Sequence, residues 1–113
     1  MIAHVVLFKP QGALGADERR AIVEGITAAV ASCPTVRACR VGKRIVHGLQ
    51  GYEQAMREDY AYALMLEFDD VAGLRAYLQH PAHAQLGGVF SSAAAALAYD
   101  YELVNLRDAA ELV

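Results

Sequence analysis

The stretch YAYALMLEFDDVAGLRAYLQHPAH, residues 60–83, decides the fold. Its first part, residues 60–68, is rich in aromatic and apolar side chains and predicts a strand, because such side chains fit a pleated, half-buried surface. Asp69–Asp70 then offers an N-cap, and a helix with an apolar stripe at helical spacing follows it. His80–Pro81 interrupts this helix. Because proline suits the first turn of a helix, we expect a second helical segment over residues 81–93.

Further strands and one more helix are expected on either side of this stretch. Residues 2–9 form a short apolar run that Pro10 stops, which predicts a strand. Residues 16–32 repeat apolar side chains every four positions and carry acids in the first turn, which predicts an amphipathic helix. The runs at 36–46 and 97–104 predict strands.

The polar, glycine-containing residues 47–59 predict a loop, and the tail after Leu106 is weakly specified. The expected order is therefore β-α-β-β-α-β, the ferredoxin-like arrangement of the α+β class. A chain of 113 residues is long enough for one core and too short for two, so residues 1–113 are expected to form a single domain.

Composition excludes several classes of protein. The net charge of -3 leaves no basic stripe for phosphates, so general nucleic-acid binding is not expected. No run of about 18 apolar residues is present, so no membrane span is expected. A hydrophobic content of 56 % argues against disorder. With two cysteines, no CxxC motif and no leader-like start, we expect a cytoplasmic protein with reduced thiols.

Alternation along the strands predicts a homodimer. Successive side chains of a strand point to opposite faces, and here both faces are largely apolar. Two helices cover only one face of a four-stranded sheet, and the other face would leave a larger apolar patch than soluble monomers expose. We therefore expect a second copy to pack on the open face, against the side chains that alternate along the last strand: Leu97, Tyr99, Tyr101 and Leu103.

Polar side chains interrupt the face that carries His4 and Phe8, which we assign to the helix-covered side. His4, Tyr62 and Asp100 lie on this face, and Tyr77 lies on the apolar stripe of the second helix. A buried polar group without a partner costs about 1–3 kcal/mol, so such a cluster is either hydrogen-bonded internally or lines a cavity.

Each of these polar residues also has a structural interpretation. His4 alone fits a satisfied core histidine, and Tyr77 a core aromatic residue whose hydroxyl reaches solvent. Asp100 could pair with Arg40 or Arg44, and His80 could cap the helix that begins at residue 81. His80 and His83 have a spacing that can seat a metal, but two histidines form an incomplete site, and no metal is expected.

His83 is the strongest candidate for chemistry. It falls in the first turn after Pro81, near the positive end of a helix, where the neutral imidazole that can accept a proton is favoured. Tyr77 could orient this imidazole or polarise a substrate oxygen. The chain has no nucleophile motif and no phosphate-binding glycine loop. These residues therefore indicate acid–base chemistry without a cofactor.

Three segments carry a family resemblance: residues 4–9, HVVLFK; residues 60–69, YAYALMLEFD; and residues 74–83, LRAYLQHPAH. Together with the Tyr-Asp-Tyr at 99–101 they resemble the stress-responsive A/B-barrel (Dabb) family. The resemblance implies a ferredoxin-like protomer that forms a dimeric α+β barrel, with a pocket between helices and sheet.

The resemblance also implies a function. A polyketide cyclase of this family uses a His–Tyr pair for a cofactor-free aldol condensation, and that pair matches His83 and Tyr77 here. Its pocket histidine and aspartate match His4 and Asp100, whereas Tyr62 stands where it has another histidine. A pocket tyrosine on its first helix falls near Ile26, and glycines at 87–88 replace bulkier residues.

The sequence thus predicts a small cofactor-independent enzyme that removes a proton next to a carbonyl of a phenolic or polyketide-like compound. The expected catalytic residues are His83 and Tyr77, and the expected ligand-binding residues are His4, Tyr62, Asp100, Phe8 and Leu64. The alternative is a non-catalytic protein that binds a small hydrophobic or aromatic metabolite. A third interpretation, a cofactor-free or haem-linked oxygenase, rests on fold analogy alone.

Overall fold

The computed structural model describes all 113 residues. The elements follow one another as β1 (Ile2–Pro10), α1 (Ala16–Ser32), β2 (Ala38–Lys43), β3 (Tyr62–Phe68), α2 (Val71–Leu78), α3 (Pro81–Ala93) and β4 (Ala94–Glu102). Short 3-10 helices lie at Glu53–Ala55 and Leu106–Glu111. The predicted β-α-β-β-α-β order, with its second helix broken at the proline, is confirmed.

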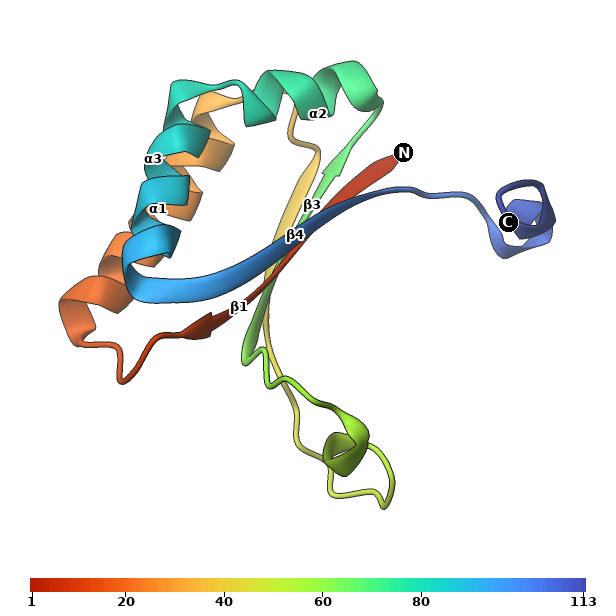
Figure 1. Cartoon of the computed structure of the whole chain (residues 1–113). Coiled ribbons are helices and arrows are strands. Elements are labelled where there is room, and N and C mark those ends of the chain that lie inside the picture. The colour runs from red at the N-terminus through yellow and green to blue at the C-terminus, as the bar shows by residue number, and fades with distance from the viewer.

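The strands form one antiparallel sheet in the order β2-β3-β1-β4. Figure 1 shows α1, α2 and α3 on one side of this sheet. The prediction of which face they cover is confirmed, since the buried side chains of β1 include His4, Val6 and Phe8. Leu64, Leu66 and Phe68 of β3 belong to the same core. The alternating side chains of β1 and β3 therefore point to the same face of the sheet at paired positions.

Several strand ends differ from the prediction. β1 ends at Pro10 rather than at residue 9, β2 begins at Ala38 rather than at 36, β3 begins at Tyr62 rather than at 60, and β4 ends at Glu102 rather than at 104. Two further differences follow from the strand pairing. β2 ends at Lys43 rather than at residue 46, because β3 begins at Tyr62 and offers no partner strand beyond that point. β4 begins at Ala94 rather than at residue 97, because the end of β1 supplies partners for the alanine run, with Ala94 opposite Pro10. Backbone pairing has therefore overridden the low strand propensity of alanine.

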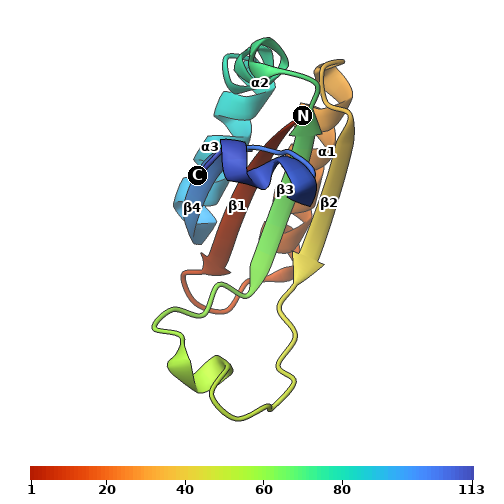
Figure 2. The same ribbon diagram turned by 90° about the vertical axis from the view of Figure 1, so that its right-hand side faces the viewer.

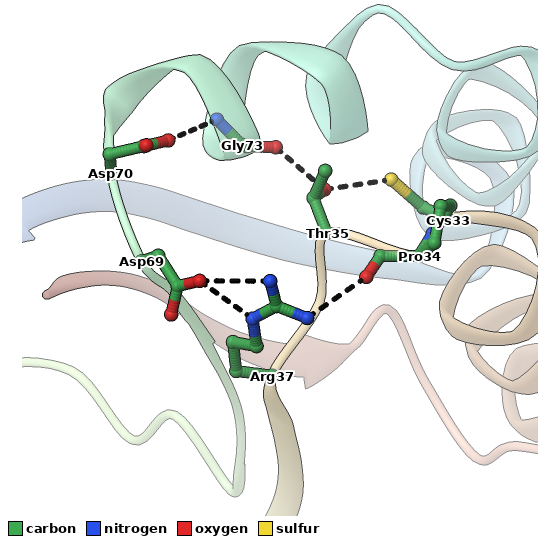
Figure 3. Close-up of polar contacts among 7 residues, drawn as sticks. All are labelled: Cys33, Pro34, Thr35, Arg37, Asp69, Asp70 and Gly73. Carbon is green, nitrogen blue, oxygen red and sulfur yellow. Dashed lines mark hydrogen bonds and ion pairs between the residues drawn. The ribbon is translucent and has the colours of Figure 1, made fainter.

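A polar network ties the first helix to the second helical unit (Figure 3). Thr35, just after α1, donates its hydroxyl hydrogen to the carbonyl of Gly73 at 2.8 Å, and the Asp70 carboxylate accepts the amide of Gly73 at 2.8 Å. Asp70 is thus the predicted N-cap of α2. Arg37 binds Asp69 at the same corner, which fixes where α2 starts relative to β2.

The other face of the sheet is uncovered, as Figure 2 shows. Of the side chains predicted to meet a partner, Leu97, Tyr99 and Tyr101 lie on this face and are exposed. Leu103, which follows the end of β4, is also exposed. The loop between β2 and β3 and the chain after β4 project from the same side (Figure 1). Both carry exposed apolar side chains, among them Ile45, Val46 and Leu106.

None of the helices combines the length and the apolar character that a membrane-spanning helix requires.

Candidate functional site

A cavity of about 410 Å³ lies between the β1–β4 half of the sheet and helices α2 and α3. Its polar wall contains four of the predicted residues, namely His4, Tyr77, His83 and Asp100. The rest of the lining is mostly small or apolar: Val6, Leu64, Leu78, Leu86, Gly87, Phe90, Ser91, Ala94, Ala96 and Ala98. A volume of this size holds a small organic molecule.

The sheet register places His4 beside Asp100. These residues are direct partners across the β1–β4 pair, so their side chains leave the same face. His4 Nδ1 lies 2.6 Å from Asp100 Oδ1, a short charge-assisted hydrogen bond. His4 is only 4 % exposed, whereas the Asp100 side chain is 40 % exposed at the rim. Asp100 therefore does not pair with an arginine. Arg44 binds Asp59 instead.

The break between α2 and α3 brings Tyr77 and His83 together. His80 Nδ1 accepts the amide of Ala82 and caps α3, so the capping role expected for His80 is the one found. Tyr77 lies in the last turn of α2 and His83 in the first turn of α3, and their ring centroids are 5.0 Å apart. The His4 ring centroid is 5.8 Å from that of Tyr77 and 6.3 Å from that of His83.

Burial shifts the acidity of both residues. It raises the pKa of Tyr77 to about 12, helped by the nearby thiols of Cys39 and Cys33, so the phenol stays protonated and can donate a hydrogen bond. Burial, followed by positive charge on His4, lowers the pKa of His83, and the Leu78 carbonyl opposes this shift. His83 is thus a neutral imidazole near pH 7, which is the form that accepts a proton.

Phe8 and Tyr62 lie elsewhere. They line a second cavity of about 650 Å³ between α1 and the β2–β3 half of the sheet, whereas Leu64 lines the first cavity. The rings of Phe8 and Tyr62 stack with centroids 5.4 Å apart, and Phe90 packs edge-on against Phe8. Because Phe90 lines the first cavity, the Phe8 ring lies between the two. The expected ligand-binding residues are therefore divided between two cavities.

Sequence reasoning missed several wall residues. Ala94, Ala96 and Ala98 line the cavity from β4. The strand pattern could have identified them, because they alternate in phase with Asp100.

Cys33 and Cys39 approach Tyr77 only through tertiary packing, and no local sequence pattern marks them. No group of three or more His, Cys, Asp or Glu side chains could hold a metal ion.

The stress-responsive A/B-barrel domain model matches residues 2–103, nearly the whole sheet and helix core. This chain belongs to the stress-responsive A/B-barrel family. No protein with a curated description matches it.

Solved structures share the fold of this A/B-barrel protein. A dimeric ferredoxin-like protein of unknown function from Jannaschia is 25 % identical, with a TM-score of 0.71 over 90 % of this chain and 98 % of that one. A Dabb family protein from Mesorhizobium loti is 21 % identical, with a TM-score of 0.70 over 92 % and 97 %. SnoaB from Streptomyces nogalater, a cofactor-independent oxygenase, is 13 % identical, with a TM-score of 0.67 over 92 % and 93 %.

Proposed function

We propose that this A/B-barrel protein is a cofactor-independent enzyme that moves protons next to a carbonyl group of a small phenolic or polyketide-like compound. The reaction would be of the cyclase, isomerase or lyase type. One observation carries the proposal: two imidazoles and a phenol line one 410 Å³ cavity, with ring centroids 5.0–6.3 Å apart. Titratable groups with shifted pKa values that converge in a cavity are typical of acid–base sites.

His83 is the general base in this proposal. The C–H bond next to the substrate carbonyl breaks, its proton passes to the neutral His83 ring, and the electron pair moves to the carbonyl oxygen. Tyr77 donates a hydrogen bond to that oxygen, because its phenol stays protonated at neutral pH. The apolar wall, including Leu64 and Phe90, holds the carbon skeleton of the substrate.

Deuterium exchange tests the proposal without knowledge of the natural substrate. The probes are aryl 1,3-diketones and aryl 3,5-diketo acids in heavy water, and NMR measures deuterium incorporation beside the carbonyl above the uncatalysed rate. His83→Ala should lower the catalysed rate by about 10²–10⁴. The matched control is His47→Ala, because His47 lies on the loop far from the cavity and should leave the rate unchanged. An unaltered rate in His83→Ala would remove the assignment.

A second candidate function is non-catalytic binding of a small hydrophobic or aromatic metabolite. The observation that favours it is the larger cavity, which is lined almost wholly by apolar side chains and contains no cluster of titratable groups. Phe8 and Tyr62 would contact the ligand there. Tight binding of the aryl probes without any acceleration of exchange would favour this function over catalysis.

The assembly in this proposal is a homodimer formed through the open face of the sheet. The side chains of Leu97, Tyr99 and Tyr101 are exposed there although they are large and apolar or aromatic. A patch of this kind is typical of an interface. Related structures described as dimeric, such as the Jannaschia protein, support the same arrangement here.

A further inference from the structure

The two imidazoles of the cavity have different partners. His4 Nδ1 lies 2.6 Å from the Asp100 carboxylate, and an ionised carboxylate can only accept, so Nδ1 carries the hydrogen. The other ring nitrogen, Nε2, makes no hydrogen bond within the chain, and His4 lines the cavity. Asp100 therefore fixes the tautomer of His4 and leaves Nε2 as the atom that is free to exchange a proton with a ligand.

His83 has no carboxylate partner. Its polar neighbours are the ring of His4, the phenol of Tyr77 and the carbonyl of Leu78, none of which carries a negative charge near neutral pH. The groups that face His4 are Asp100 from β4, Tyr77 from α2 and His83 from α3, while β3 presents only apolar leucines. Asp100 is thus the only negative charge among the groups around the two rings.

We infer that His4, held by Asp100, is the general acid of this site: when the two imidazoles share one extra proton, it resides on His4 while His83 stays neutral. A carboxylate favours the charged form of an imidazole that it contacts. When only one of two neighbouring imidazoles has such a contact, that ring serves as the acid and the other as the base. The lowered pKa of His83, to which the charge on His4 contributes, agrees with this division. The inference rests on the proposed function and assigns its general acid.

The proton balance closes within the site. As the C–H bond breaks and its proton passes to His83, the N–H bond of the His4 imidazolium breaks, and that proton forms the O–H bond of the enol. His83 is then charged and His4 neutral. When the enol reverts or isomerises, His83 returns its proton to carbon and His4 takes back the hydroxyl proton, so no further reactant is needed.

The order in which the two rings take up protons tests the inference without turnover. The chain has four histidines, so ¹⁵N NMR of histidine-labelled protein, assigned with single His→Gln variants, can follow each ring as the pH falls. We expect His4 to gain its second proton before His83. Asp100→Asn should abolish this order, and Asp100→Glu, which keeps the charge, should preserve it. Earlier protonation of His83 in the wild type would overturn the inference, as would an unchanged order in Asp100→Asn.

Kinetics provides the second test and separates the two proposals. With the aryl diketone probes, Asp100→Asn should lower kcat for exchange by about 10²-fold while KM changes little, since a lost acid acts on the chemical step. Asp108→Asn removes a carboxylate from the C-terminal segment and should have no effect. If His83→Ala abolishes exchange but Asp100→Asn retains full kcat, the general-acid role is wrong and the proposed function stands. If the wild type exchanges no probe, both fail.

Discussion

The hydroxyl of Thr35 and the carbonyl of Gly73, 38 residues apart in sequence, are joined by a 2.8 Å hydrogen bond. Thr35 follows the C-terminus of α1, and Gly73 lies in the first turn of α2 (Figure 3). The contact fixes the position of α2, and therefore of Tyr77 at its far end. The geometry of the site thus depends on a bond that lies outside the cavity.

Thr35→Val should destabilise the fold by about 1 kcal/mol, because the substitution keeps the shape of the side chain and removes its hydrogen bonds with the Gly73 carbonyl and Cys33 Sγ. The matched control is Thr27→Val, which removes a similar hydroxyl bond, to the Val23 carbonyl, on the exposed side of α1. Chemical denaturation of both variants measures the difference. Equal stability of the two variants would show that the Gly73 contact adds nothing beyond a local bond.

Gly88→Ala should stabilise the protein by about 0.4–1 kcal/mol, since an alanine loses less backbone entropy than glycine inside a helix. A Cβ at Gly88 meets nothing within 4 Å, and neither does one at Gly87. Gly87 lines the cavity, however, and Gly88 does not. Both variants should therefore melt at a higher temperature, but only Gly87→Ala should weaken binding of the aryl probes. Identical binding by the two variants would place the ligand elsewhere.

The contribution of His83 to stability should fall as the pH drops below about 6.5, the pKa of an unperturbed histidine. The pKa of His83 is lowered in the folded state, so the unfolded chain takes up this proton first and protonation favours unfolding. Above about pH 6.5 the ring is neutral in both states and contributes nothing. His83→Gln should therefore lose less stability than the wild type between about pH 7 and pH 5, as measured by urea unfolding. Parallel pH profiles would contradict this.

Tyr99→Lys should convert a dimer to a monomer, because it puts a charge into the apolar face that would be buried against the partner. Light scattering during gel filtration measures the mass, which should be twice 12.2 kDa for the wild type. Val71→Lys is the control, since Val71 is 55 % exposed and Tyr99 54 %, but Val71 lies on α2, on the other side of the sheet. A wild-type monomer, or a dimeric Tyr99→Lys, would exclude this interface.

The alternation of the strands made the covered face predictable. His4, Val6 and Phe8 share a face by the period of a strand, and the structure buries all three. Asp70 and Pro81 marked the starts of α2 and α3 because N-caps and helix-initiating prolines are local signals. The register between β1 and β4 joins segments that are far apart in the sequence, so no local signal predicts it. This register pairs His4 with Asp100.

The division of the helix-covered face into two cavities could not be predicted from the sequence, for a similar reason. Tyr62 and His4 share a face, but they lie on different strands, near opposite ends of the β1–β3 pair, since Tyr62 is opposite Phe8 and His4 is opposite Leu66. Whether such residues meet depends on which side chains fill the space between them. Here the Phe8 ring does so, through its contacts with Tyr62 and Phe90.

Ala94, Ala96 and Ala98 form a row whose methyl side chains are small enough to leave room for the cavity. Each position points at the ligand space from a strand whose backbone is held by β1, so a larger residue would take up volume without moving the strand. None of the three takes part in the proton transfers proposed for His4 and His83. Ligand size can therefore change during evolution independently of the reaction, by exchange of methyl groups for bulkier ones along a single strand.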